Sequence, residues 1–186
     1  MTTTTDRHIV ARRVTAAEFT GFGRAIELLA GGTDVVTTRG AGWSDHRSLD
    51  AVLDTAGHLG LTIGSAEPLR VDAMERHLHT KEALFCAGAP VVVAVADTAG
   101  DVPHADDVRA FVIEPGDVVI LDEGIWHTAC HGLGAPTPYY WLATADDSIA
   151  DVWAPVTGGP LEVDVDFTHS AMPANSSKPA SHGGSQ

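Results

Sequence analysis

The chain has 186 residues, of which 44% are hydrophobic, so one folded domain with a substantial core is expected. Its formal net charge of −14, without a cluster of lysines or arginines, argues against a nucleic-acid partner, because a phosphate backbone is bound by a basic face. No apolar run approaches the roughly 18 residues that a membrane helix needs, and the N-terminus lacks the apolar core of a secretion signal. We therefore expect a cytoplasmic protein with no membrane partner.

The first predicted element is a short helix that begins after Thr15. Thr15 is a typical N-cap residue and Glu18 follows three residues later, which is the pattern of a capping box. Apolar side chains then recur at helical spacing, namely Phe19, Phe22, Ile26 and Leu29. Gly31-Gly32 predicts the end of the helix, and two glycines inside the pattern indicate that it begins late or stays short.

From about residue 58 the sequence changes to short alternating runs separated by glycine, proline and aspartate. The segment LEVDVDF alternates apolar and acidic residues without exception, as a half-buried strand does. Candidate strands are 59–65, 69–78, 82–86, 90–97, 109–114, 117–122, 125–131, 138–145, 149–154 and 161–167. Many short strands with little helix between them predict a mainly β fold, either a sandwich or a barrel.

Both ends of the chain are predicted to lie outside the folded domain. The last residues are rich in Ser, Pro, Gly and Ala, and they cannot bury enough apolar surface to offset their ordering entropy. We therefore expect a disordered N-terminus at 1–8, a barrel domain at 9–167 and a disordered tail at 168–186.

The segment MERHLHTKE contains two histidines one residue apart. If 69–79 formed one strand, alternate side chains would share a face, and the imidazoles of His77 and His79 would project together. Glu82 could return to the same point from the next strand, and the alternative is a surface acid paired with Lys81. This segment therefore offers three ligands from one part of the chain.

A fourth ligand is expected from a distant strand. His127 follows a glycine turn in EGIWHTACHG, with Trp126 on the opposite face of the extended segment. Mixed imidazole and carboxylate ligands suit divalent ions such as Fe, Mn, Ni or Zn, and ligand type alone does not choose among them. The predicted metal ligands are His77, His79, Glu82 and His127.

Several segments together resemble the ureidoglycolate lyase family of the cupin superfamily. They are TAAEFTGFGRAIE, PLRVDAMERHLHTKEALF, VRAFVIEPGDVVILDEGIWH and the valine run between the last two. The family has Glu-Arg-His, Leu/Val-Arg-Ala-Phe and Gly-Val-Trp-His segments in this order, and the similarity covers roughly residues 9–165. The resemblance implies a cupin-type double-stranded β-helix (jelly-roll) barrel, usually a homodimer, that splits ureidoglycolate into glyoxylate and urea.

The chain departs from this family at three places. The family tends to have Tyr-His-Arg where this chain has Leu121-Asp122-Glu123, and it often has a second histidine where this chain has Thr128. Two acids in place of a basic pair should weaken a grip on a carboxylate-bearing substrate. Glu82 stands where the family commonly has Gln, which adds an anionic ligand and favours a divalent cation. We expect the fold to carry over, and the substrate stays open.

Four further residues are candidates for catalysis. Glu75 lies two residues before the first histidine and could be the general base, or it could orient an imidazole. In an extended segment His131 shares a face with His127 and could be a proton shuttle or a ligand. Arg109 could hold a substrate carboxylate in a bidentate fork or form a structural ion pair, and Asp122 could contact a polar group of the substrate.

Three functions are compatible with these residues. The first is a metal-dependent lyase of the ureidoglycolate type acting on a small polar hydroxy acid. The second is a metal-dependent dioxygenase or isomerase of a small metabolite on the same barrel. The third is a small-molecule-binding module without catalysis, although no DNA-binding helix pair is present to make it a regulator.

Overall fold

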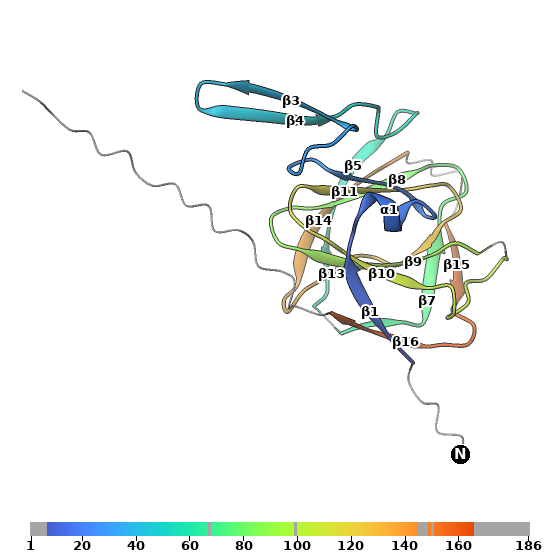
Figure 1. Cartoon of the computed structure of the whole chain (residues 1–186). Helices are drawn as coiled ribbons and strands as arrows, with labels where there is room; N and C mark the ends of the chain where they lie inside the picture. Colours follow the sequence, from blue (N-terminus) through green and yellow to red (C-terminus); the bar gives the residue numbers. More distant parts are fainter. Residues whose placement is uncertain (1–6, 67, 99, 145–148, 150, 166–186) are drawn as a thin grey trace, which may run out of the picture.

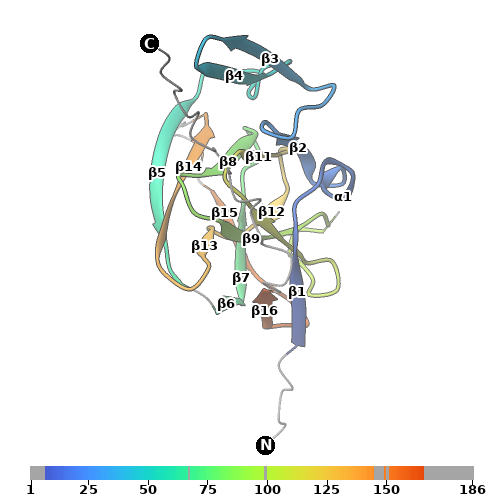
Figure 2. The same ribbon diagram turned by 60° about the vertical axis from the view of Figure 1, so that its left-hand side comes forward.

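The protein, seen here as a computed structural model, consists of two curled β-sheets around a common core (Figures 1 and 2). The described residues are 7–66, 68–98, 100–144, 149 and 151–165. The nine-stranded sheet has the order β15 (Val152–Pro155), β7 (Ala73–Arg76), β12 (Trp126–His127), β9 (Val91–Ala96), β10 (Arg109–Ile113), β1 (Arg7–Arg13), β16 (Leu161–Val165) and β6 (Leu69–Val71), with β13 (His131–Gly132) also paired to β9. The five-stranded sheet has the order β2 (Gly23–Glu27), β11 (Asp117–Leu121), β8 (Glu82–Cys86), β14 (Thr137–Ala143) and β5 (His58–Gly64). This architecture confirms the mainly β barrel with a short N-terminal helix.

The valine-rich strand β9 is buried on both faces. Val91, Val93 and Val95 point into the space between the two sheets, where they meet apolar residues of β8, β11 and β14. The alternate residues of β9 point to the other side, where Met74 and Trp126 pack. A strand enclosed on both faces is apolar throughout, which explains its uninterrupted run of Val and Ala.

A two-stranded hairpin projects from the body of the barrel (Figures 1 and 2). Its strands are β3 (Val35–Gly40) and β4 (Trp43–Ser48), which pair only with each other in the described part of the chain. At its base, Val35 and Val52 pack on the outer face of the five-stranded sheet. These strands, together with β1 and β2, were not predicted from the sequence.

The predicted helix is present but much shorter than its apolar spacing indicates. Helix α1 covers only Ala16–Phe19, with Thr15 as the N-cap whose hydroxyl accepts a hydrogen bond from the Glu18 amide. Ile26, predicted as a helical position, lies in β2, which pairs with β11. Gly23 explains the change, because its φ of 137° is accessible to glycine and suits an entry into a strand. The prediction that the helix extends beyond Phe19 was therefore wrong.

The first strand begins two residues before the predicted start of the barrel domain at residue 9. Strand β1 begins at Arg7, where it pairs in parallel with Leu161 of β16. The last described residue of β16 is Val165. Residues 1–6 and 166–186, which include most of the predicted disordered N-terminus and the whole predicted tail, lie outside the described residues.

Within the described residues, no helix is both long and apolar enough to cross a membrane.

A buried carboxylate lies at the start of β11. Asp117 is almost fully buried, with its Oδ2 3.8 Å from a guanidinium nitrogen of Arg13. Arg13 also faces Glu27 and Glu114, at 3.9 and 3.4 Å. Burial raises the pKa of Asp117 to about 6, and the charge of Arg13 opposes this only in part. The folded pKa lies above the ordinary value of 3.8, so the stability that Asp117 contributes is present below pH 3.8 and is lost as the pH rises through 6.

We expect the substitution Asp117→Asn to raise the free energy of unfolding at pH 7.5 by about 1–3 kcal/mol, since one pKa unit corresponds to about 1.4 kcal/mol. The gain should shrink toward zero as the pH falls below 4, because the wild-type carboxyl is then neutral in both states. Urea unfolding at several pH values measures this difference. The control Asp107→Asn, at an exposed carboxyl, should leave the pH dependence unchanged. Identical pH profiles for Asp117→Asn and the wild type would contradict the assignment.

Candidate active site

The candidate site lies where the two sheets meet at one end of the barrel. Glu82 is the first residue of β8 in the five-stranded sheet. Glu75 of β7 and His127 of β12 are paired neighbours in the nine-stranded sheet, and both share a face with Val95 of β9. His77 lies in the coil that leads from β7 to β8. The structure therefore brings together four of the residues selected from the sequence.

The Glu82 carboxylate lies between two imidazoles. Its Oε2 is 3.3 Å from Nε2 of His77 and 2.9 Å from Nε2 of His127. Only 12% of the Glu82 side chain and 3% of the His127 side chain are exposed. Burial alone would raise the pKa of Glu82, but the contacts with His127 and His77 lower it to about 2. Glu82 is therefore a buried anion and not the surface partner of Lys81.

The outer nitrogen of each imidazole is held by an oxygen. Nδ1 of His77 lies 2.7 Å from Oδ1 of Asp151, and Nδ1 of His127 lies 3.0 Å from the carbonyl oxygen of Ile125. A carbonyl can only accept, so His127 carries a proton on Nδ1 and, when neutral, a lone pair on Nε2. These outer partners fix the orientation of both rings and place both Nε2 atoms close to Oε2 of Glu82.

The buried Nε2 atom of His127 has no hydrogen-bond partner in the described structure. Its distance of 2.9 Å to Glu82 would permit a hydrogen bond, but the direction of the contact does not. A buried ring nitrogen that makes no well-aligned hydrogen bond is open to a further ligand.

Glu75 is the second carboxylate of the cluster. Its Oε1 is 3.9 Å from Nε2 of His127, which is longer than a hydrogen bond. Burial raises the pKa of Glu75, the nearby charges of His127 and His77 lower it, and Glu82 and Asp151 raise it. One ligand atom from each of Glu75, His77 and His127 lies within 4.8 Å of the others, which is close enough for the three residues to hold a metal ion.

The prediction that His77 and His79 share a strand face was wrong. The predicted strand 69–79 is interrupted after Val71, and its second part, β7, ends at Arg76. His77 and His79 therefore lie in coil, with ring centroids 6.4 Å apart. His79 is outside the group of three possible ligands, and its buried Nδ1 has no partner in the described structure.

His131 lies on the opposite face from His127. His127 pairs with Val95 of β9, whereas His131 pairs with Val92. His131 is four residues after His127, but their partners on β9 are only three residues apart. The segment therefore contains one extra residue relative to β9, and this reverses which side chains face the cluster. Burial lowers the pKa of His131. The expectation that His131 and His127 share a face was wrong, because the segment is not one continuous strand.

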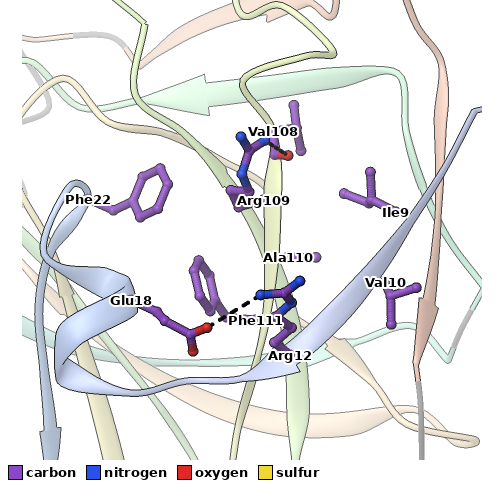
Figure 3. A pocket seen from close by; sticks show the side chains of 9 residues that line it. All are labelled: Ile9, Val10, Arg12, Glu18, Phe22, Val108, Arg109, Ala110 and Phe111. Carbon is purple, nitrogen blue, oxygen red and sulfur yellow. Dashed lines mark hydrogen bonds and ion pairs between the residues drawn. The ribbon is translucent and has the colours of Figure 1, made fainter.

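Arg109 and Asp122 have other partners. The guanidinium of Arg109 donates to the carbonyl oxygens of Asp106 and Val108, both at 2.9 Å. Figure 3 shows Arg109 at a separate pocket of about 370 Å³, whose lining residues include none of the four cluster residues. The carboxylate of Asp122 lies 3.1 Å from Nζ of Lys81, in a half-exposed ion pair.

Two residues near the cluster were not selected from the sequence. Asp151 holds His77, but it lies in a segment that was predicted only as a strand, and no spacing pattern connects it to the histidines. Trp153 of β15 pairs with Glu75 and so shares its face, with 60% of the residue exposed at the edge of the sheet. Both residues could have been identified only from the pairing of β15 with β7, which no pattern in the sequence indicates.

We expect His77 to titrate far above an ordinary histidine in protein freed of metal by a chelator. Burial lowers its pKa, but the contacts with Glu82 and Asp151 outweigh burial and raise the pKa to about 9. The stability that this proton contributes is therefore present below pH 6.5 and is lost as the pH rises through 9. Histidine NMR titration should show the high pKa and its decrease in Asp151→Asn.

The matched control for this titration is Asp164→Asn, which removes a carboxylate 3.0 Å from the exposed His8. It should leave the His77 titration unchanged. A His77 resonance that titrates near pH 6.5 in both wild type and Asp151→Asn would contradict the contact.

Comparison with known proteins identifies the family. The family model described as ureidoglycolate lyase matches residues 6–157. A ureidoglycolate lyase from Rhodobacter capsulatus is 32% identical over 131 residues, which cover 68% of this chain and 80% of that protein. An RmlC epimerase of Mycobacterium tuberculosis is a structural neighbour with a TM-score of 0.44 and 12% identity, over 75% of this chain and 80% of its own. RmlC of Streptococcus suis, in complex with dTDP-D-xylose, is another structural neighbour, with a TM-score of 0.37 and 11% identity. The match covers 67% of this chain and 72% of that one. On the family match and the relative, the chain belongs to the ureidoglycolate lyase family.

Proposed function

We propose that this protein is a metal-dependent lyase that cleaves a C–N bond of ureidoglycolate or a closely related hydroxy acid. The match of the ureidoglycolate lyase family across residues 6–157 supports the reaction. The convergence of His77, Glu82 and His127 supports the metal. The substrate would be a small molecule, the protein would be cytoplasmic, and the family resemblance implies a homodimer.

The donor set suits a divalent ion such as Fe, Mn, Ni or Zn. His77 and His127 each have the outer ring nitrogen held by an oxygen, which is how metal-binding histidines are commonly oriented. Their Nε2 atoms and Glu82 Oε2 would be the ligands, and Glu75 lies beside them and would stay free to act on the substrate. His79, although named with them from the sequence, is not needed. A bound ion would supply a Lewis acid for the hydroxyl or carboxylate of the substrate.

The residues of this chain can move the proton that the cleavage requires. Glu75 would accept the proton of the substrate hydroxyl, and the carbon–oxygen bond would become a carbonyl as the C–N bond breaks. The electron pair of the broken bond goes to the nitrogen of the leaving urea, and the same proton then completes that nitrogen. Glu75 fits this role because it shares a face with His127, and its Oε1 lies 3.9 Å from Nε2 of that histidine, beyond hydrogen-bond distance.

We expect His77→Ala to lose most of its bound metal and its lyase activity. Removal of one of three ligands leaves an incomplete site, so the metal content of purified protein should fall at least tenfold. Elemental analysis, together with glyoxylate release from ureidoglycolate, measures both effects. His104→Ala, which removes an exposed histidine of another loop, is the control and should retain metal and activity. Wild-type protein that binds no divalent ion would refute the metal part of the proposal.

Glu75→Gln should retain metal and lose turnover. An amide of the same shape cannot accept the proton, so kcat should fall about 100- to 10,000-fold with little change in KM. Steady-state kinetics on metal-loaded protein gives both constants, and Glu123→Gln, at an exposed acid, is the control. Unchanged kcat would exclude Glu75 as the base. Oxygen consumption with ferrous protein, without glyoxylate release, would instead favour a dioxygenase.

A further inference from the structure

Strand β15 carries an exposed tryptophan at the edge of the nine-stranded sheet. Trp153 is 60% exposed, although tryptophan is a large apolar residue that is highly buried on average. Its neighbours Val152 and Ala154 pack into the apolar core on the other face of the strand. The second exposed tryptophan, Trp43, lies over Gly40 of its own hairpin, where an added Cβ would be 2.3 Å from the indole ring. Trp43 therefore packs within the hairpin, whereas Trp153 projects beside the polar cluster.

Trp153, Glu75 and His127 form a row across three adjacent strands. Trp153 pairs with Glu75, and Glu75 pairs with His127, so all three side chains project from the same face of the sheet. The exposed fraction rises along this row, from 3% for the His127 side chain to 18% for the Glu75 side chain and 60% for Trp153. Solvent therefore reaches the cluster from the β15 edge, and a molecule that approaches Glu75 from this edge passes the indole.

The charges at this edge restrict what can lie against the indole. Asp151 precedes Trp153 by two residues, and its half-exposed carboxylate lies 2.7 Å from His77. Glu75 provides a second carboxyl group on the neighbouring strand. An anionic group placed at Trp153 would be repelled by both acids. An uncharged planar group such as an amide is not repelled, and it can lie flat on the apolar face of the ring.

We propose that Trp153 binds the uncharged planar end of the substrate. This role rests on the proposed function, in which Glu75 takes the proton of the substrate hydroxyl and a ureido nitrogen leaves. The indole belongs to the next strand, about 4.8 Å from Glu75 along the row, a spacing that a ureido group on the reacting carbon can span. The substrate carboxylate then lies at the end away from Asp151. Trp153 thus favours substrates with a planar uncharged group on the reacting carbon over hydroxy acids that lack one.

Binding of an analogue that is not cleaved tests this contact without turnover. Ureidoacetate keeps the ureido and carboxylate groups of ureidoglycolate but lacks the hydroxyl whose proton the reaction removes. In NMR titrations, Trp153→Leu should weaken ureidoacetate binding about 3- to 10-fold and leave the binding of glycolate, which has no ureido group, unchanged. Trp153→Phe should restore most of the loss, because it returns an aromatic face. Trp43→Leu removes an equally exposed tryptophan and is the matched control, which should bind both molecules as the wild type does.

Steady-state kinetics gives a second measurement. Trp153 would contact the substrate equally in the ground state and the transition state, so Trp153→Leu should raise KM about 3- to 10-fold with kcat within about threefold of the wild type. If Trp153→Leu does not fold, Trp153→Gln replaces it with the same expected losses.

Two results would overturn the role of Trp153. One is an equal loss of ureidoacetate and glycolate binding, and the other is ureidoacetate binding by Trp153→Leu as tight as that of the wild type. Wild-type protein that binds ureidoacetate through Trp153 but releases no glyoxylate from ureidoglycolate would instead contradict the lyase and support the contact.

Discussion

The contact of one buried carboxylate with two imidazoles sets the requirements for the rest of the molecule. Glu82 belongs to the five-stranded sheet, whereas His127 belongs to the nine-stranded sheet, and their side-chain atoms approach to 2.9 Å. A shift of 1 Å between the sheets would break that contact. The apolar residues packed between the sheets, such as Val93 and Leu84, therefore determine the geometry of the polar cluster at the end of the barrel.

The charged groups of the cluster also compensate one another electrostatically. Glu75, Glu82 and Asp151 bring three carboxylates to two imidazoles, so the local field remains negative even when His77 is protonated. A buried anion without compensation is costly, and in the absence of metal the cluster obtains compensation from a His77 proton that persists to about pH 9. A divalent cation would satisfy the same field and the unpartnered nitrogen of His127. Both the types of these residues and their positions therefore suit a bound cation.

The sequence was most informative where a residue's role depends on its immediate neighbours. The predicted strand 82–86 coincides with β8, and the alternation in LEVDVDF correctly marks β16. His77, Glu82 and His127 were also selected correctly as residues that meet, because their types and spacing are unusual. The strands of the first third were missed. In the hairpin strands β3 and β4 most side chains are exposed on both faces, so the sequence shows no alternation of apolar and polar residues there.

The remaining errors concern strand register, which the partners of a strand decide. The extra residue between His127 and His131 is visible only from their pairing with β9, and it sends the two rings to opposite faces. Because side chains alternate along a strand, β8 also contributes residues to both faces of its sheet. Glu82 points inward to the cluster, whereas Phe85 lies on the opposite face of the strand, where it stacks on Tyr140 of β14. The stacking of Phe85 on Tyr140 holds β8 and β14 together from outside, as the valines of β9 do from within, and so helps to fix the position of Glu82.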